Sequence, residues 1–127
     1  MTTKINSKAE LKKAAATLHD ARFTADAIGF DDSTNVFTLK CWVFESEQNR
    51  GRSPRRWKAC RLSFKDVADY NAVTREKVCY YELSTMRFSE AEHRLDLVTH
   101  YGIRITLKIG ELDGELTETG ETRELWN

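Results

Sequence analysis

The sequence predicts an α+β fold in which an N-terminal helix packs on one face of a largely antiparallel meander sheet of about six strands. Apolar residues recur at helical spacing in the first nineteen positions, and from residue 21 onward the pattern changes to a period of two. Polar turns separate the alternating stretches. An antiparallel sheet with one apolar face needs a cover, and the amphipathic helix is suited to provide it.

The helix is expected over about residues 8–19. Ser7 and Glu10 fit a capping box, in which the Ser7 hydroxyl accepts a bond from the Glu10 N–H and the Glu10 carboxylate returns one. The apolar stripe that would face the sheet consists of Leu11, Ala14, Ala15 and Leu18. The helix should end near His19 and Asp20, where the period changes.

Three strands are expected in the middle of the chain. Residues 21–30 and 36–44 alternate in the manner of a hairpin, and the turn between them, 31–35, is rich in Asp, Asn and Ser. Residues 56–64 form the third strand of this region. The segment 65–73 that follows is predicted to be a loop or a single helical turn.

The last third of the chain has the clearest strand pattern. Residues 78–88, 94–100 and 102–112 form an up-and-down series separated by polar turns. In the third of these strands, apolar and polar residues alternate strictly from Ile103 to Ile109, which predicts one buried and one wet face. The sheet should therefore extend over about residues 21–117.

Length, charge and the C-terminal composition set further bounds. A chain of 127 residues suits one core, so residues 1–127 are expected to form a single domain that ends in a loosely ordered acidic tail, about 118–127. Twenty Lys and Arg balance twenty Asp and Glu, so no net charge draws the chain toward nucleic acid or membrane. There is no signal-peptide pattern and no apolar run that could span a bilayer, which predicts a cytoplasmic protein without a membrane partner.

The cysteines are odd in number, and Cys41, Cys60 and Cys79 each lie in an apolar stretch. This predicts reduced thiols that pack as small core residues. No pair has the close C-x-x-C spacing of a zinc site, and no histidine stands at a recognised ligand spacing. The sequence therefore predicts neither a metal nor a cofactor.

A basic segment in the middle of the chain is the main candidate for a binding surface. From Gln48 to Lys65 there are seven basic residues and no acidic one. The residues proposed to contact a partner are Arg50, Arg52, Arg55, Arg56 and Trp57. Such a segment could hold a phosphate backbone while Trp57 stacks on an unpaired base. The same segment also fits a solvated loop. Its arginines could instead pair with the six carboxylates between Glu111 and Asn127, or with an acidic protein partner.

His19 and Asp20 adjoin the end of the helix and are interpreted as a structural joint. A protonated histidine at a helix C-terminus interacts favourably with the helix macrodipole, and its ring can orient the chain through hydrogen bonds. The alternative is an enzyme built around His19 with Asp20 or Asp31. That alternative is the weaker one, because no nucleophile, phosphate-binding loop or other catalytic signature accompanies the pair. No catalytic residue is assigned.

The order of short segments resembles that of a known group of proteins. LHDARF from Leu18 to Phe23, the acidic turn at 31–32, FTLKCWVF, RLSFKDV, STMRF and the hairpin LDLVTHYGIRITLKIGEL resemble a loose group of small bacterial α+β proteins. Some members of that group are assigned as immunity proteins that neutralise partner toxins. The resemblance covers about residues 18–116 and implies an interaction role without a cofactor.

The first functional hypothesis is thus a non-catalytic protein-binding or regulatory module, of which an immunity-type protein is one form. Its partner would be another protein or a second copy of the chain. The second hypothesis is nucleic-acid binding through the arginine-rich segment 50–61, which predicts a steep loss of affinity as salt rises. An enzyme with a site near His19 is the third.

Overall fold

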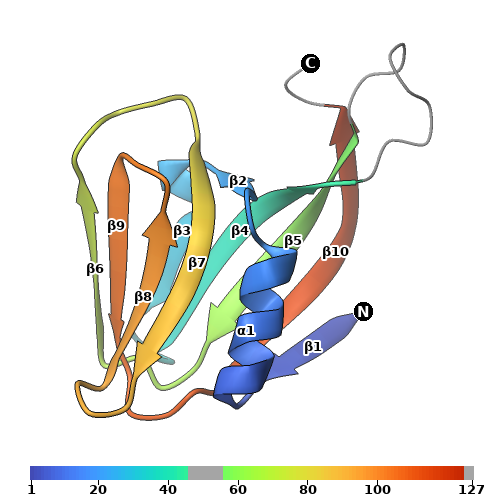
Figure 1. The fold of residues 1–127 in the computed structure, drawn as a ribbon. Coiled ribbons are helices and arrows are strands. Elements are labelled where there is room, and N and C mark those ends of the chain that lie inside the picture. The colour runs from blue at the N-terminus through green and yellow to red at the C-terminus, as the bar shows by residue number, and fades with distance from the viewer. Residues whose placement is uncertain (46–55, 125–127) are drawn as a thin grey trace.

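The computed structural model describes residues 1–45 and 56–124, and in these residues one α-helix and ten strands surround a common hydrophobic core (Figure 1). The elements, in chain order, are β1 (Thr2–Ile5), α1 (Lys8–Thr17), β2 (Arg22–Phe23), a short 3-10 helix (Ala25–Ala27), β3 (Ile28–Asp31), β4 (Val36–Phe44), β5 (Arg56–Phe64), β6 (Asp69–Thr74), β7 (Tyr81–Ser89), β8 (Arg94–Thr99), β9 (Ile103–Lys108) and β10 (Gly114–Glu124). The α+β class and the antiparallel sheet are confirmed, with more strands than the six or so expected.

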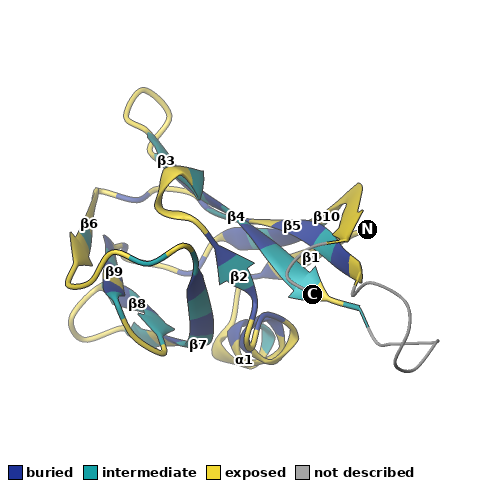
Figure 2. Ribbon diagram, turned by 90° about the horizontal axis from the view of Figure 1, so that it is seen from above, coloured by how far each residue is buried: buried dark blue, intermediate teal, exposed yellow. Residues whose placement is uncertain are grey.

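The strands form one antiparallel sheet in the order β1-β10-β5-β4-β2-β7-β8-β9-β6, and β3 pairs with β4 beside this path. Seen from above, the sheet curls (Figure 2), and the buried side chains of its strands form one hydrophobic core cluster. The ring of Tyr70 on β6 contacts Phe30 on β3 at 5.2 Å and Phe37 on β4 at 5.9 Å, measured between ring centroids. These contacts bring the far edge of the sheet back toward its middle.

Helix α1 covers the open side of this curled sheet, between β7 and β1 (Figure 1). Ser7 caps it as expected, since its hydroxyl accepts the Glu10 N–H at 3.2 Å. The Glu10 carboxylate accepts a hydrogen bond from the backbone N–H of Asn6 at 2.9 Å, one residue before the N–H used in the usual capping box. Leu11, Ala14 and Ala15 are buried against the sheet, as the apolar stripe predicted. The helix ends at Thr17, two residues before the expected limit.

Residues 21–30, expected as one strand, are divided into β2, the 3-10 helix and β3. Three other stretches also differ from the prediction. The segment 65–73, expected as a loop or helical turn, contains most of strand β6. Residues 118–124, expected in a loosely ordered tail, belong to β10, whereas 125–127 lie outside the described residues. The first strand, β1, was not predicted. All three are edge strands or strand ends with mostly exposed side chains, so they carry little of the apolar alternation that marks a half-buried strand.

Strand β2 joins the two halves of the sheet and determines where an open edge appears. It has only two residues, and Arg22 pairs with Trp42 of β4 on one side and with Glu82 of β7 on the other. Beyond this short bridge, β4 and β7 separate and α1 lies beside β7 (Figure 1). The edge of β7 from Ser84 onward therefore faces the helix instead of another strand.

The core is built from the inward rows of β4, β5, β8 and β9. The large side chains that are almost entirely buried are Phe23, Phe37, Phe64, Ile5, Leu18, Leu39, Leu62, Leu83, Leu95, Leu97, Ile105 and Leu107. The alternation from Ile103 to Ile109 is confirmed, because its apolar residues are all buried. Within the described ranges, no helix has the length and apolar character needed to cross a membrane.

Candidate functional site

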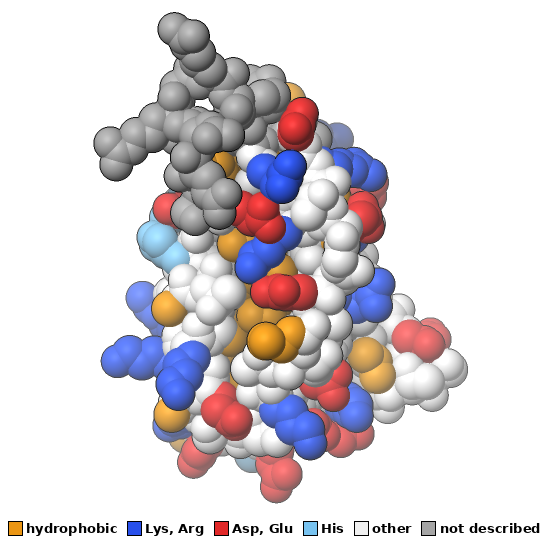
Figure 3. All heavy atoms as spheres, turned by 90° about the vertical axis from the view of Figure 1, so that its right-hand side faces the viewer, with side chains coloured by type: hydrophobic (Ala, Val, Ile, Leu, Met, Phe, Trp, Pro, Cys, Tyr) orange, Lys and Arg blue, Asp and Glu red, His pale blue; other side chains and the backbone are white. Residues whose placement is uncertain are grey.

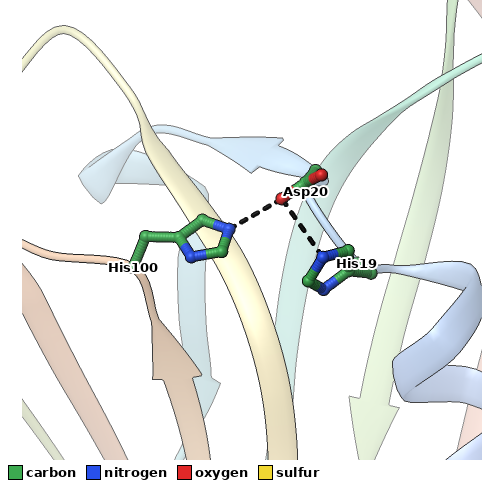
Figure 4. A group of neighbouring side chains, drawn as sticks. All are labelled: His19, Asp20 and His100. Atoms are coloured by element: carbon green, nitrogen blue, oxygen red, sulfur yellow. Dashed lines mark hydrogen bonds and ion pairs between the residues drawn. The ribbon is translucent and has the colours of Figure 1, made fainter.

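His19, Asp20 and His100 form a cluster at the top of the junction between α1 and β7 (Figure 4). Asp20 Oδ1 lies 2.7 Å from His100 Nε2 and 3.6 Å from His19 Nε2. The two imidazole rings meet edge to face, with centroids 5.7 Å apart. One possible ligand atom from each residue lies within 4.8 Å of the other two, and within residues 1–45 and 56–124 no other set of three His, Cys, Asp or Glu side chains does so.

Each member of the cluster is held to the backbone of β7. The Asp20 N–H donates to the Leu83 carbonyl at 2.8 Å, and the His100 N–H donates to the Glu82 carbonyl at 3.0 Å. His19 Nδ1 lies 2.8 Å from the Ser84 carbonyl. Because a carbonyl oxygen can only accept, Nδ1 carries the proton and Nε2 of a neutral His19 presents its lone pair toward Asp20. Residues far apart in sequence are thus placed by consecutive residues of one strand.

Asp20 also has a special backbone conformation. Its φ angle of 66° lies in the left-handed region, which Asp and Asn enter more readily than most residues. This is the conformation that commonly ends an α-helix. His19 and Asp20 therefore occupy the junction between α1 and β2 that the sequence indicated, and the side chain of Asp20 turns toward His100.

A groove of about 500 Å³ runs along α1 and β7 and reaches His19 at one end. It is lined by Lys8, Leu11, Lys12, Ala15, Ala16 and His19 of the helix side, and by Ser84, Thr85, Met86, Arg87 and Phe88 of β7. Five consecutive residues of β7 take part, although side chains alternate between the two faces of a strand. The groove therefore follows the edge of β7, where the strand backbone itself is within reach.

The ionisable side chains that line this groove are all basic. Lys8, Lys12, Arg87 and His19 are its ionisable lining residues, and no carboxylate lines it. In the described part of the chain, neither lysine forms an ion pair, and Arg87 forms none either. The floor is apolar, because Leu11, Ala15 and Met86 are nearly buried beneath it.

The cations of β4 and β5, in contrast, meet the acidic C-terminal segment. Lys58 Nζ lies 3.0 Å from Glu118, and Lys40 Nζ lies 2.8 Å from Glu121. The ammonium of Lys58 lowers the pKa of Glu118, chiefly through this hydrogen bond, and Lys40 lowers the pKa of Glu121 in the same way. Figure 3 shows acidic and basic side chains alternating down the side of the molecule formed by β5 and β10.

The structure describes only the end of the arginine-rich segment. Arg50, Arg52 and Arg55 lie outside the described residues. Arg56 is exposed at the start of β5, directly opposite Glu124 of β10. The antiparallel pairing of β5 with β10 thus places Arg56 beside Glu124 of the acidic segment, and pairing of the arginines with these carboxylates stays a prediction.

Trp57 does not present its ring to solvent. It is 4% exposed, packs against Phe44 with ring centroids 5.4 Å apart, and lies under the guanidinium of Arg22 at 4.6 Å. The Arg22 guanidinium also lies over the ring of Tyr80, 4.2 Å from its centroid. Stacking of Trp57 on a base, as the nucleic-acid hypothesis requires, would mean that the ring leaves this packing. Large aromatic and cationic side chains here stabilise the neighbourhood of β2 instead.

Two of the thiols lie together in the core. Cys41 and Cys60 face each other across β4 and β5, and both are buried and reduced. Burial raises the pKa of both thiols, so neither is an accessible nucleophile at neutral pH. Cys79 is exposed, against the prediction that all three would be core residues.

A second, smaller groove of about 300 Å³ lies on the outer face of β8 and β9. Arg75, Arg87 and Arg104 line it together with Asp96 and Tyr101. Asp96 already accepts bonds from Arg94 and Thr106, so its charge is partly neutralised. This groove is mixed in charge and is less well defined as a site than the one beside α1.

Sequence reasoning identified His19 and Asp20 but not His100, Lys8, Lys12 or Arg87. His100 and Asp20 are 80 positions apart, and no local spacing signals their contact. Comparison of the chain with protein-family models, curated proteins and solved structures finds no match. The resemblance to small bacterial immunity-type proteins accordingly stays a prediction.

Proposed function

We propose that this chain is a non-catalytic binding module that holds an extended, acidic segment of a protein partner in the groove between α1 and β7. The observation that carries the proposal is the lining of the groove. Five consecutive residues of β7 line it, and all of its ionisable side chains are basic. An extended segment can add to such an edge through main-chain hydrogen bonds, and its side chains then decide specificity. The immunity-type resemblance points to the same class of function.

The charges of the groove decide which segment fits. Lys8 and Lys12 are one helical turn apart on α1, and Arg87 lies across the groove on β7. Acidic side chains placed between them would be attracted from both sides, whereas a basic or neutral segment would gain nothing. The apolar floor of Leu11 and Met86 favours apolar residues at alternate positions, as an extended strand would supply them.

The test uses a fluorescein-labelled decapeptide of alternating Glu and Val, with an alternating Lys and Val peptide as the control for charge. Lys12→Glu is the diagnostic variant and Lys13→Glu is its matched control. Both lysines are exposed neighbours on α1, but only Lys12 lines the groove. Reversing an exposed charge changes binding by about 1 kcal/mol, so Lys12→Glu should weaken the acidic peptide about five-fold and Lys13→Glu less than two-fold.

Hydrogen exchange locates the bound peptide. Protection should rise in segments that contain residues 84–88 and 8–19, because the peptide would cover the open edge of β7. Equal loss of affinity in Lys12→Glu and Lys13→Glu, or protection elsewhere, would contradict the proposal. Tighter binding of a single-stranded oligothymidine than of the acidic peptide would favour the nucleic-acid hypothesis instead.

A further inference from the structure

We propose that His19, Asp20 and His100 form a binding site for a divalent transition-metal ion, with zinc as the best match. The site adjoins the proposed peptide groove and shares His19 with it, but its argument does not rest on the proposed function. It rests on three side chains that converge from the end of α1 and from the turn after β8 (Figure 4).

The separations of the ligand atoms suit a small ion. Two ligands of a tetrahedral zinc ion with bonds of about 2.0–2.1 Å lie about 3.3 Å apart. Asp20 Oδ1 is 2.7 Å from one imidazole nitrogen and 3.6 Å from the other, on either side of that value. Ring and carboxylate rotations that move these atoms by about an ångström complete the geometry.

Hydrogen bonds to β7 supply the support that a metal-ligating histidine usually has. A ligating imidazole commonly donates its second N–H to a backbone carbonyl, which fixes its tautomer and its orientation. The Nδ1–H of His19 donates to the Ser84 carbonyl at 2.8 Å, which leaves Nε2 as the ligand atom. The backbone N–H groups of Asp20 and His100 donate to the Leu83 and Glu82 carbonyls of β7. The backbone that carries the other two ligands is therefore fixed as well.

Ion binding changes one proton position. In the free protein, the 2.7 Å contact between His100 and Asp20 is a hydrogen bond from Nε2–H to the carboxylate. When the ion binds, Nε2 becomes a ligand and the single proton of the neutral ring moves to Nδ1. The carboxylate exchanges a hydrogen bond for a metal bond, and any imidazolium proton at the site is released when the ion binds.

The ligand set selects the class of metal. Two imidazole nitrogens and one carboxylate oxygen match zinc and its neighbours, whereas magnesium and calcium require oxygen ligands almost throughout. The side chains of His19, Asp20 and His100 are 54%, 60% and 37% exposed, so a fourth position is open to water. Three protein ligands and one open position are the arrangement of an accessible zinc centre, in contrast to a closed structural one.

The experiment is a calorimetric titration of the tag-free protein with zinc chloride at neutral pH, in a Cys79→Ser background that removes the exposed thiol. We expect one zinc per chain and no response to magnesium chloride. His19→Gln and His100→Gln should each weaken zinc binding by at least about ten-fold, because even a lost second-shell contact costs 10- to 100-fold. His93→Asn is the matched control, because His93 is an exposed histidine of a different turn with a φ of 50° that Asn tolerates.

Imidazole NMR of the Cys79→Ser protein provides a measurement that needs no histidine substitution. Zinc should shift the Nε2 resonances of His19 and His100 while the Nδ1–H of His19 remains, and the resonances of His93 should not move. Absence of binding, binding unaffected by His19→Gln and His100→Gln, or loss of binding in His93→Asn would each overturn the proposal.

Discussion

The close contact of Gly114 with β5 leads to a sharp stability prediction. Gly114 opens β10, between Ile5 of β1 and Phe64 of β5, and is buried. A Cβ added there would lie 2.6 Å from the Phe64 ring and 2.7 Å from the Ser63 carbonyl oxygen. Ordinary contact begins at about 3.4 Å, so backbone and a fully buried ring would have to move apart.

The expected cost follows from this overlap. Overpacking of a closed core costs about 1–3 kcal/mol, and we take the middle of that range, about 2 kcal/mol, for Gly114→Ala. With a urea m-value of about 1.5 kcal/mol/M, the unfolding midpoint should fall by about 1.3 M. The assay is urea unfolding followed by far-UV circular dichroism at fixed protein concentration.

Gly110→Ala is the matched control for this substitution. The nearest atom to its added Cβ is Nδ1 of His93, at 4.0 Å, which is an ordinary contact. The change should therefore leave the stability within about 1 kcal/mol of the parent, and a small gain from reduced unfolded-state entropy is expected. If Gly114→Ala were as stable as Gly110→Ala, β10 would not be packed on β5 as described.

Two further predictions concern pH and the thiols. Because Lys58 and Lys40 lower the pKa values of Glu118 and Glu121 below the ordinary 4.5, the stabilisation is present above that value and is lost as pH falls through the lowered values. Urea midpoints should therefore drop on acidification, and less so in a variant with Gln at both glutamate positions; equal pH profiles would contradict the ion pairs. Native protein should react with a thiol reagent only at Cys79, and all three thiols should react in urea; mass spectrometry that finds a second label in the native state would show that the core thiols are accessible.

The sequence predicted best those parts of the fold that have a strong local pattern, either alternating burial or a helix cap. The predicted strands 36–44 and 56–64 coincide with β4 and β5, because alternation of buried and less buried residues marks most of each strand. The helix start at Ser7 followed from side-chain chemistry that acts within one turn. In these segments, local pattern and tertiary packing agree, so a single sequence suffices.

The missed parts depend on neighbours that are distant in sequence. Residues 118–124 have exposed side chains, and they belong to a strand because Glu118 and residues 122–124 pair with β5. Contact of His100 with Asp20 depends on the length of β8 and on the way β2 bridges β7, and neither leaves a motif. The same holds for the groove, which requires a strand edge left open by the shortness of β2.

The charge arrangement gives the neutral chain a local preference. Strand pairing sets Lys40 and Lys58 against glutamates of β10, so these cations of the sheet are neutralised within the molecule. Lys8 and Lys12 belong to a helix that no acidic segment of the described chain approaches closely enough to pair. Under the proposed function, an acidic partner would accordingly be drawn to α1 and β7, because Lys40 and Lys58 are already paired. The neutral chain therefore combines ion pairs between β10 and its neighbouring strands with a groove whose lysines form no ion pair in the described residues, and the proposed acidic segment would meet these lysines.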